Sequence, residues 1–140
     1  MKDDSERILA IDYGEKRIGL AISDPLKLFA IPLITLENNK LLFTELKKIF
    51  SNYNFVKVII GYPLKEDGSK TIITSHVEEF KENISKQFKI ITEFIDERYS
   101  SSIAWEQIKE SVTSKKKRRD KSLIDKNAAA VILKDYLNTI

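Results

Sequence analysis

Three stretches of this 140-residue chain carry carboxylates where they could do chemistry. Asp12 lies in the apolar run ILAIDYG, where a charge is costly to bury unless it is paired, hydrogen-bonded or bound to a metal. Asp96 and Glu97 end a second apolar run, and Asp125 lies at the start of the last predicted helix. The chain has no cysteine and one histidine. Carboxylates on separate elements then favour a hard, oxygen-seeking cation such as Mg²⁺ or Mn²⁺ over a zinc or thiolate site.

Each carboxylate also has a purely structural interpretation. Asp12 could turn toward solvent at a strand end or pair with a lysine. Asp96 and Glu97 could be a solvated strand end, and only one of them can share a face with Asp12, because successive strand side chains face opposite ways. Asp125 completes an S-x-x-D capping box with Ser122, and that spacing alone favours a helix cap. The residues by themselves leave these alternatives open.

The hydrophobic pattern predicts the elements that must position these side chains. Strands are expected at residues 8–13, 17–23, 29–36, 55–61 and 89–96, and helices at 38–52, 72–88, 100–112 and 122–137. Residues 14–16 form a predicted hairpin turn, and Pro32 suits an edge strand or a bulge. This order predicts an α/β fold with a central mixed five-stranded sheet flanked by helices. The length fits one domain over residues 1–140.

The positive charge of the chain is concentrated in one segment. The formal net charge is +3, from 24 basic and 21 acidic residues. Five of the cations are consecutive, namely Lys115, Lys116, Lys117, Arg118 and Arg119, and without them the acidic residues outnumber the basic ones. Such a run is commonly a solvated loop. Its place just before Asp125 predicts a polyanionic partner whose phosphates would pass near that carboxylate.

The sequence contains no pattern typical of targeting or membrane insertion. The N-terminal segment is polar and acidic, and no apolar run approaches the roughly 20 residues of a spanning helix. We therefore expect a cytoplasmic protein with no membrane partner. His76 is expected on a helix and partly exposed, and it has no visible catalytic partner.

Four motifs in order give the chain a resemblance to a known family. They are DYGEKRIG at 12–19, continued by AISDP at 21–25; GYPLKEDG at 61–68; DERYSS at 96–101; and a terminal D-x-x-A-A-x-x-I-L-x-x-Y-L at 125–137. Together they resemble the YqgF family of pre-16S rRNA nucleases, also described as Holliday-junction-resolvase-like, within the ribonuclease H-like superfamily. The sequence departs from the family where glycine, leucine and threonine are common, at Lys27, Tyr99 and Ser101.

The resemblance implies a site and a cofactor. Asp12, Glu97 and Asp125 would be the catalytic and metal-binding triad, which chooses Glu97 over Asp96. Two Mg²⁺ or Mn²⁺ ions about 4 Å apart would activate water and stabilise the leaving oxygen. The nucleic-acid contacts would come from basic residues, namely Lys16, Arg17, Arg98, Lys121 and the run 115–119.

The resemblance also implies a function, with two rivals. The expected activity is metal-dependent endonucleolytic processing of the 5′ end of pre-16S rRNA during ribosome biogenesis, with structured RNA or ribosomal precursor particles as partners. One rival is a resolvase of branched DNA, for which a homodimer would match the symmetric junction. The other is a non-catalytic RNA-binding assembly factor. A nucleotide-binding loop of the actin and sugar-kinase type is discounted, because those proteins need two such domains.

Overall fold

The computed structural model describes residues 3–63, 70–96 and 121–140 of the chain, and it does not describe the side chains of Asp3 and of residues 121–127. The predicted helix at 100–112 and the basic run at 115–119 lie outside the described residues, as do Glu97 and Arg98. Within the described part, no helix is both long and apolar enough to cross a membrane.

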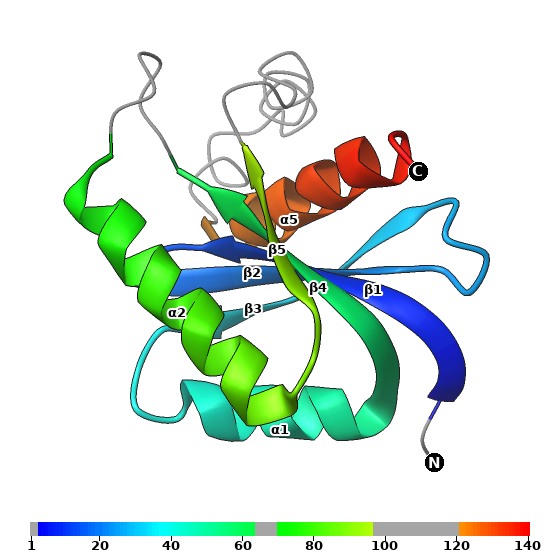
Figure 1. Ribbon diagram of the computed structural model, residues 1–140, viewed down its shortest axis with the longest axis horizontal. Coiled ribbons are helices and arrows are strands. Elements are labelled where there is room, and N and C mark those ends of the chain that lie inside the picture. Colours follow the sequence, from blue (N-terminus) through cyan, green and yellow to red (C-terminus); the bar gives the residue numbers. More distant parts are fainter. Residues whose placement is uncertain (1–2, 64–69, 97–120) are drawn as a thin grey trace.

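Five strands and three helices make up the described structure (Figure 1). In chain order they are β1 (Asp3–Tyr13), β2 (Arg17–Ser23), β3 (Ala30–Glu37), α1 (Leu42–Asn52), β4 (Tyr53–Tyr62), α2 (Ile72–Phe88), β5 (Thr92–Asp96) and α5 (Lys121–Leu137). The strand order across the sheet is β3-β2-β1-β4-β5. β1, β2 and β3 are antiparallel neighbours, whereas β4 runs parallel to β1 and β5 parallel to β4. The predicted mixed five-stranded sheet is confirmed.

Two apolar clusters on opposite faces of the sheet divide the molecule into three layers. Helices α1 and α2 cover one face, here called the α1/α2 face, and α5 covers the other, the α5 face (Figure 1). Alternation along the strands sorts the side chains, so that Leu9 and Ile11 of β1 join the α1/α2 cluster while Ile8 and Ala10 join the α5 cluster.

Pro32 lies on the edge strand β3, as predicted. It pairs in register with Ala21 of β2, and the register shifts between Leu20 and Ala21. A proline has no backbone N–H to give to a ladder, so an outer strand with an irregularity accommodates it at little cost.

Three element starts differ from the prediction by three residues or more, each for an identifiable reason. β1 begins five residues earlier because Asp3 already pairs with Tyr53 of β4. α1 begins at Leu42, since Asn38 and Asn39 form a turn in which the Asn39 side chain accepts a hydrogen bond from the Leu41 N–H (2.9 Å). β5 begins at Thr92, because the residue after α2 is a left-handed cap with φ 50° and the chain needs further residues to turn into the strand.

The loop between β2 and β3 contains the residue that departs most clearly from the family pattern. Lys27 has φ 58°, a left-handed conformation that favours glycine, which is the residue common there in the family. The Asp24 carboxylate accepts backbone N–H bonds from Leu28 (2.7 Å) and Phe29 (2.6 Å), and the Phe29 bond is the largest cause that lowers the pKa of Asp24. The Asp24 side chain therefore organises this loop around the strained residue.

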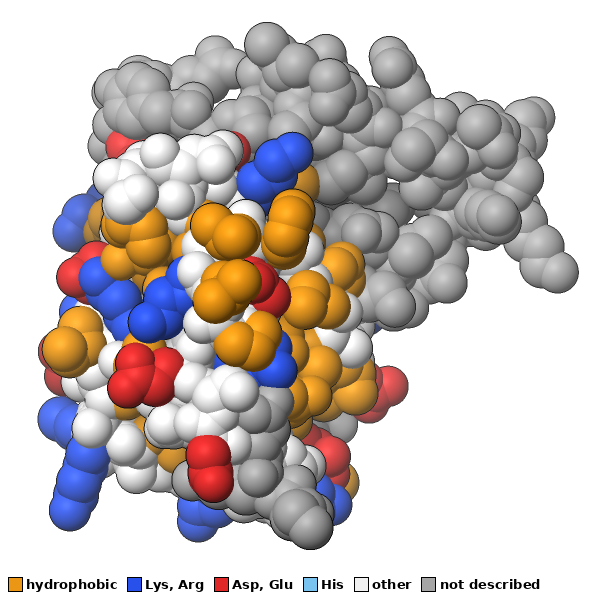
Figure 2. Space-filling view, turned by 90° about the vertical axis from the view of Figure 1, so that its right-hand side faces the viewer, with side chains coloured by type: hydrophobic (Ala, Val, Ile, Leu, Met, Phe, Trp, Pro, Cys, Tyr) orange, Lys and Arg blue, Asp and Glu red, His pale blue; other side chains and the backbone are white. Residues whose placement is uncertain are grey.

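Apolar side chains gather on the side of the molecule where this loop meets the end of α5 (Figure 2). Leu26, Leu28 and Phe29 are exposed, and a shallow pocket of about 480 Å³ lies between the loop and α5. Because β2 runs antiparallel to β1, this surface lies at the end of the sheet where β1 begins. It is remote from the end that carries Asp12.

Candidate active site at the carboxyl edge of the sheet

The three parallel strands end together at one edge of the sheet, here called the carboxyl edge. Ile11 of β1 pairs with Ile60 of β4, and Gly61 of β4 pairs with Ile95 of β5. Asp12 is therefore in line with Gly61, one residue beyond the last register pair of β1 and β4. In open α/β sheets, ligands bind at the carboxyl ends of parallel strands, so this edge is the natural place for a site.

Asp12 lies on the α5 face of this edge. It follows Ile8 and Ala10 at intervals of two residues, and both of those side chains are buried in the cluster under α5. The Asp12 side chain is half-buried, in contrast to Ala10, which is completely buried. The carboxylate thus emerges where the apolar layer ends.

Glycines flank Asp12 on both neighbouring strands. Gly19 of β2 is its register partner, and Gly61 of β4 is in line with it on the other side. Both glycines belong to the α5 face, because Ala21 and Ile59, two residues away along their strands, pack in the α5 cluster. Neither of these two positions therefore adds a side chain beside the carboxylate.

The end of β5 bears on the choice between Asp96 and Glu97. Ile95 packs with the α5 cluster and Phe94 with the α1/α2 cluster, so Asp96 belongs with Phe94 on the α1/α2 face. Asp96 therefore does not share a face with Asp12. This excludes Asp96 as the partner, while Glu97 itself lies outside the described residues.

α5 brings the last motif to the α5 face. The helix begins at Lys121, one residue before the predicted start, and it includes both Ser122 and Asp125. Ala128 and Ala129 are both buried, and Ala129 packs against the sheet, where its small side chain lets the helix lie close. Asp125 comes three and four residues before them, which is about one helical turn. The backbone position of Asp125 is described, but its side chain is not.

The turn between β1 and β2 holds the first basic candidates beside this edge. Gly14 is required there, because a Cβ at this position would lie 2.4 Å from the carbonyl oxygen of Arg17. Lys16 is exposed in the turn, and Arg17, the first residue of β2, is half-buried. Among the other predicted nucleic-acid contacts, Arg98 and residues 115–119 lie outside the described residues, and Lys121 is described only in its backbone.

A charged pair supports α5 further down the same face. Lys57 of β4 donates to the hydroxyl of Tyr136 and forms an ion pair with Glu93 (2.9 Å), and its ammonium lies 4.9 Å from the Tyr136 ring centre. The hydrogen bond to Tyr136 is the largest cause that raises the pKa of Lys57 above its usual value. The terminal tyrosine of the family motif thus fastens α5 to the sheet.

No group of three potential metal ligands forms among the residues that the structure describes. Of the predicted triad, only Asp12 contributes a described side chain. The donor type fits a hard cation, since a half-buried carboxylate offers the oxygen ligands that such cations prefer.

Comparison with known families and sequences gives consistent matches over nearly the full length. The model of the family described as "RuvX: Holliday junction resolvase" matches residues 6–139. A protein of Caldicellulosiruptor bescii named "Putative pre-16S rRNA nuclease" is 43% identical over 135 residues, which cover 94% of this chain and 96% of that protein. A protein of Chlorobium phaeobacteroides with the same name is 43% identical over 133 residues, covering 94% and 92%.

The fold is also found among solved structures. RuvC of T. thermophilus, solved in complex with a Holliday junction substrate, superposes with a TM-score of 0.58 and covers 96% of both chains. Sequence identity is 10%, so this similarity concerns the fold alone. It confirms the predicted ribonuclease H-like architecture.

Proposed function

This chain belongs to the RuvX family, the YqgF family that its motifs resemble, and on that premise we propose that it is a metal-dependent endonuclease. It hydrolyses phosphodiester bonds in structured nucleic acid. The favoured substrate is the 5′ end of pre-16S rRNA, in keeping with the names of its full-length relatives. Residues 1–140 act as one nuclease domain in this proposal.

The observation that carries the proposal is the environment of Asp12. Asp12 is a half-buried carboxylate at the end of a buried strand, and the positions beside it on both neighbouring strands are glycines, which carry no side chain. An arrangement of this kind serves the binding of a cation and a phosphate better than it serves packing.

Asp12, Glu97 and Asp125 are the proposed ligands of the metal. Asp12 would bridge or bind both ions, and the other two carboxylates would complete the ligand set. Two facts support the choice of partners: Asp96 lies on the opposite face, and Asp125 precedes the buried alanines of α5 by one turn. When Mg²⁺ or Mn²⁺ is bound, it supplies the activation of water and the stabilisation of the leaving oxygen.

Basic side chains are proposed to hold the phosphate backbone along this edge. Lys16 is exposed in the turn next to Asp12, and Arg17 follows it at the start of β2. We assign the same phosphate-binding role to Arg98, Lys121 and residues 115–119. Binding then depends steeply on salt, because each neutralised phosphate releases counterions.

A resolvase of branched DNA is the second candidate, and the description of the family model favours it. The proposed metal chemistry is the same, and the substrates differ in their geometry. A homodimer would suit a two-fold symmetric junction, and ribosomal precursor particles would be the partners of the RNA nuclease. A cytoplasmic location agrees with either candidate.

Cleavage assays with both substrates test the proposal. Labelled precursor 16S rRNA and a four-way DNA junction are each incubated with the protein in Mg²⁺, in Mn²⁺ and in EDTA. We expect cleavage of the rRNA with either metal and none in EDTA. Cleavage of the junction alone would favour the resolvase. Tight RNA binding without metal-dependent turnover of either substrate would favour the non-catalytic assembly factor and contradict the nuclease.

A further inference from the structure

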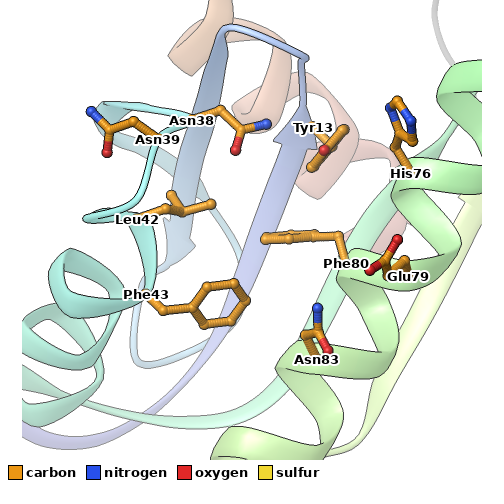
Figure 3. A pocket seen from close by; sticks show the side chains of 9 residues that line it. All are labelled: Tyr13, Asn38, Asn39, Leu42, Phe43, His76, Glu79, Phe80 and Asn83. Atoms are coloured by element: carbon orange, nitrogen blue, oxygen red, sulfur yellow. The ribbon is translucent and has the colours of Figure 1, made fainter.

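A second hollow lies at the carboxyl edge, on the face opposite to Asp12. It measures about 360 Å³ and lies between the start of α1 and one side of α2, with the end of β1 at its back (Figure 3). We call it the α1/α2 pocket. Its walls are formed by nine residues, namely Tyr13, Asn38, Asn39, Leu42, Phe43, His76, Glu79, Phe80 and Asn83.

One side of α2 supplies the wall that carries most of the polar groups. His76, Glu79, Phe80 and Asn83 follow one another at helical spacing, so they form a stripe along the helix. In Figure 3 the Phe80 side chain projects from α2 toward Leu42 and Phe43, and Glu79 and Asn83 lie on either side of it along the helix. The apolar residues of α2 that fill the core, such as Val77 and Ile84, lie beside this stripe.

Aromatic rings form the apolar part of the pocket. The ring centre of Phe80 lies 5.0 Å from that of Tyr13 and 6.0 Å from that of Phe43. Phe80 is buried, whereas Tyr13 and Phe43 are only half-buried and keep surface on the hollow. Planar aromatic surface of this kind suits the stacking of a nucleobase, as in proteins that bind single-stranded nucleic acid.

Some polar side chains of the pocket already form hydrogen bonds within the protein, and others do not. The Asn38 amide donates to the Gly14 carbonyl (2.9 Å), and the Asn39 side chain is held in the turn before α1. Among the residues that the structure describes, the Glu79 carboxylate and the Asn83 amide have no hydrogen-bond partner. These two groups are available to a ligand.

The pocket adjoins the proposed path of the nucleic acid. Besides its side-chain bond to Gly14, Asn38 donates its backbone N–H to the carbonyl of Lys16 (2.9 Å), so the pocket wall is tied to the basic turn. Tyr13 directly follows Asp12, and the two side chains lie on opposite faces of the same strand end. A strand that crosses the carboxyl edge can therefore present a phosphate on one side and a base on the other.

The charge of Glu79 determines which part of a nucleotide fits. A carboxylate accepts hydrogen bonds and repels the negative phosphate. It pairs well with an exocyclic amino group, as acidic side chains do with the N4 amine of cytosine, and an asparagine amide offers both a donor and an acceptor to a base edge. The pocket is thus matched to a base and not to a phosphate.

We propose that the α1/α2 pocket binds an unpaired nucleobase that carries an exocyclic amino group, next to the scissile position of the substrate strand. The proposal rests on the proposed nuclease function, since it assigns the base to the strand that is cut. Stacking comes from Tyr13 and Phe43, and recognition comes from Glu79 and Asn83.

Cytidine and uridine form a matched pair of probes for this proposal. They differ in the amino or oxo group at ring position 4, and neither carries a phosphate. The ¹⁵N-labelled full chain is titrated with each nucleoside in EDTA, and the signals of α2 residues 76–83 and of the Asn83 side-chain amide are followed. We expect saturable shifts at these positions and cytidine binding about five- to tenfold tighter than uridine binding.

Two variants on the same helix separate recognition from general charge. Glu79→Gln is expected to abolish most of the preference for cytidine. Glu82→Gln is the matched control, because Glu82 is exposed on α2 and pairs with Lys86 outside the pocket. This variant should bind both nucleosides as the parent protein does.

Three results would overturn the pocket assignment: no saturable shift at α2 with either nucleoside, equal affinity for the two, or equal effects of the two variants. The titration contains no metal and requires no cleavage. The titration can therefore be interpreted even if the nuclease assay fails. If the protein is an active nuclease but the titration is negative, only the pocket assignment is rejected.

Discussion

The two faces of the sheet are built from different kinds of residue, although the same strands form both. On the α1/α2 face, large side chains such as Leu9, Ile11 and Ile60 fill the layer, and aromatic rings continue it toward the carboxyl edge. On the α5 face, alanines share the apolar layer with isoleucines and leucines, and at the edge this layer ends at Asp12, which lies between two glycines. Both faces thus contribute a buried layer, and the α5 face also carries the candidate catalytic carboxylate.

The largest expected effect on stability comes from Ile11→Ala on the α1/α2 face. Ile11 is completely buried, so the loss of its side chain removes apolar contacts and leaves a cavity. We expect the free energy of unfolding to fall by about 2–5 kcal/mol, measured by urea denaturation. Ile34→Ala, the exposed equivalent on β3, is the control. Equal effects of the two substitutions would contradict the assignment of the core.

A side chain added on the other face should act on activity. Gly61→Val would place a branched side chain beside Asp12, and we expect cleavage to fall about 100-fold, which corresponds to a displacement of the substrate by about 1 Å. Ile60→Val, one residue earlier and on the α1/α2 face, is the control and should leave cleavage unchanged. Thermal melting of both variants would show whether a loss of fold accounts for the result. Full activity of folded Gly61→Val would contradict the need for open space.

The support of α5 should have a smaller effect that depends on pH. Tyr136→Phe removes the hydroxyl that accepts from Lys57, at a cost of about 1 kcal/mol. The pKa of Lys57 is raised in the folded protein, so this contribution is present below the usual lysine pKa of 10.5 and is lost as the pH rises through the folded value. Denaturation between about pH 8 and pH 11, the range around the lysine pKa, should therefore separate parent and variant most at the lowest of these pH values. An equal difference at all these pH values would argue against the Lys57 contact.

The smallest effect is expected in the loop between β2 and β3, which belongs to neither face. Lys27→Gly relieves the left-handed conformation but makes the unfolded chain more flexible, so we expect a net gain of about 0.5–1 kcal/mol. The ion pair of Lys27 with Glu6 (3.6 Å) is exposed on the Glu6 side and should contribute little. Glu6→Gln tests that contribution separately. A loss of stability in Lys27→Gly would show that the side chain matters more than its backbone conformation.

Much of the fold could be predicted because the hydrophobic pattern is strong where elements are buried. The bounds of β2 and α2 agree with the prediction, and Pro32 lies at an irregular edge as its chemistry demands. The starts of α1 and β5 could not be predicted, because they depend on a turn tied to Lys16 and on a left-handed cap at Lys89. A contact with Lys16, which is distant in the sequence, determines the start of α1, and the backbone conformation of Lys89 determines the start of β5.

The candidate site was predictable in its residue types and less so in its surroundings. Alternation along a strand restricts Asp12 to one face, but only the packing of Ile8 and Ala10 under α5 identifies that face. The glycines beside Asp12 come from two other strands, so their proximity depends on the register. The α1/α2 pocket was missed, although the spacing of His76, Glu79, Phe80 and Asn83 along α2 is the signal that could have indicated it.

The most direct test of the account compares Asp12→Asn with Asp96→Asn. Both substitutions neutralise one carboxylate near the carboxyl edge, but the two side chains lie on opposite faces. In a Mg²⁺-supported cleavage assay, Asp12→Asn should lose activity by at least about 1,000-fold with little loss of nucleic-acid binding, whereas Asp96→Asn should remain within about threefold of the parent. Full activity of Asp12→Asn, or an equal loss in both variants, would contradict the assignment of catalysis to the α5 face.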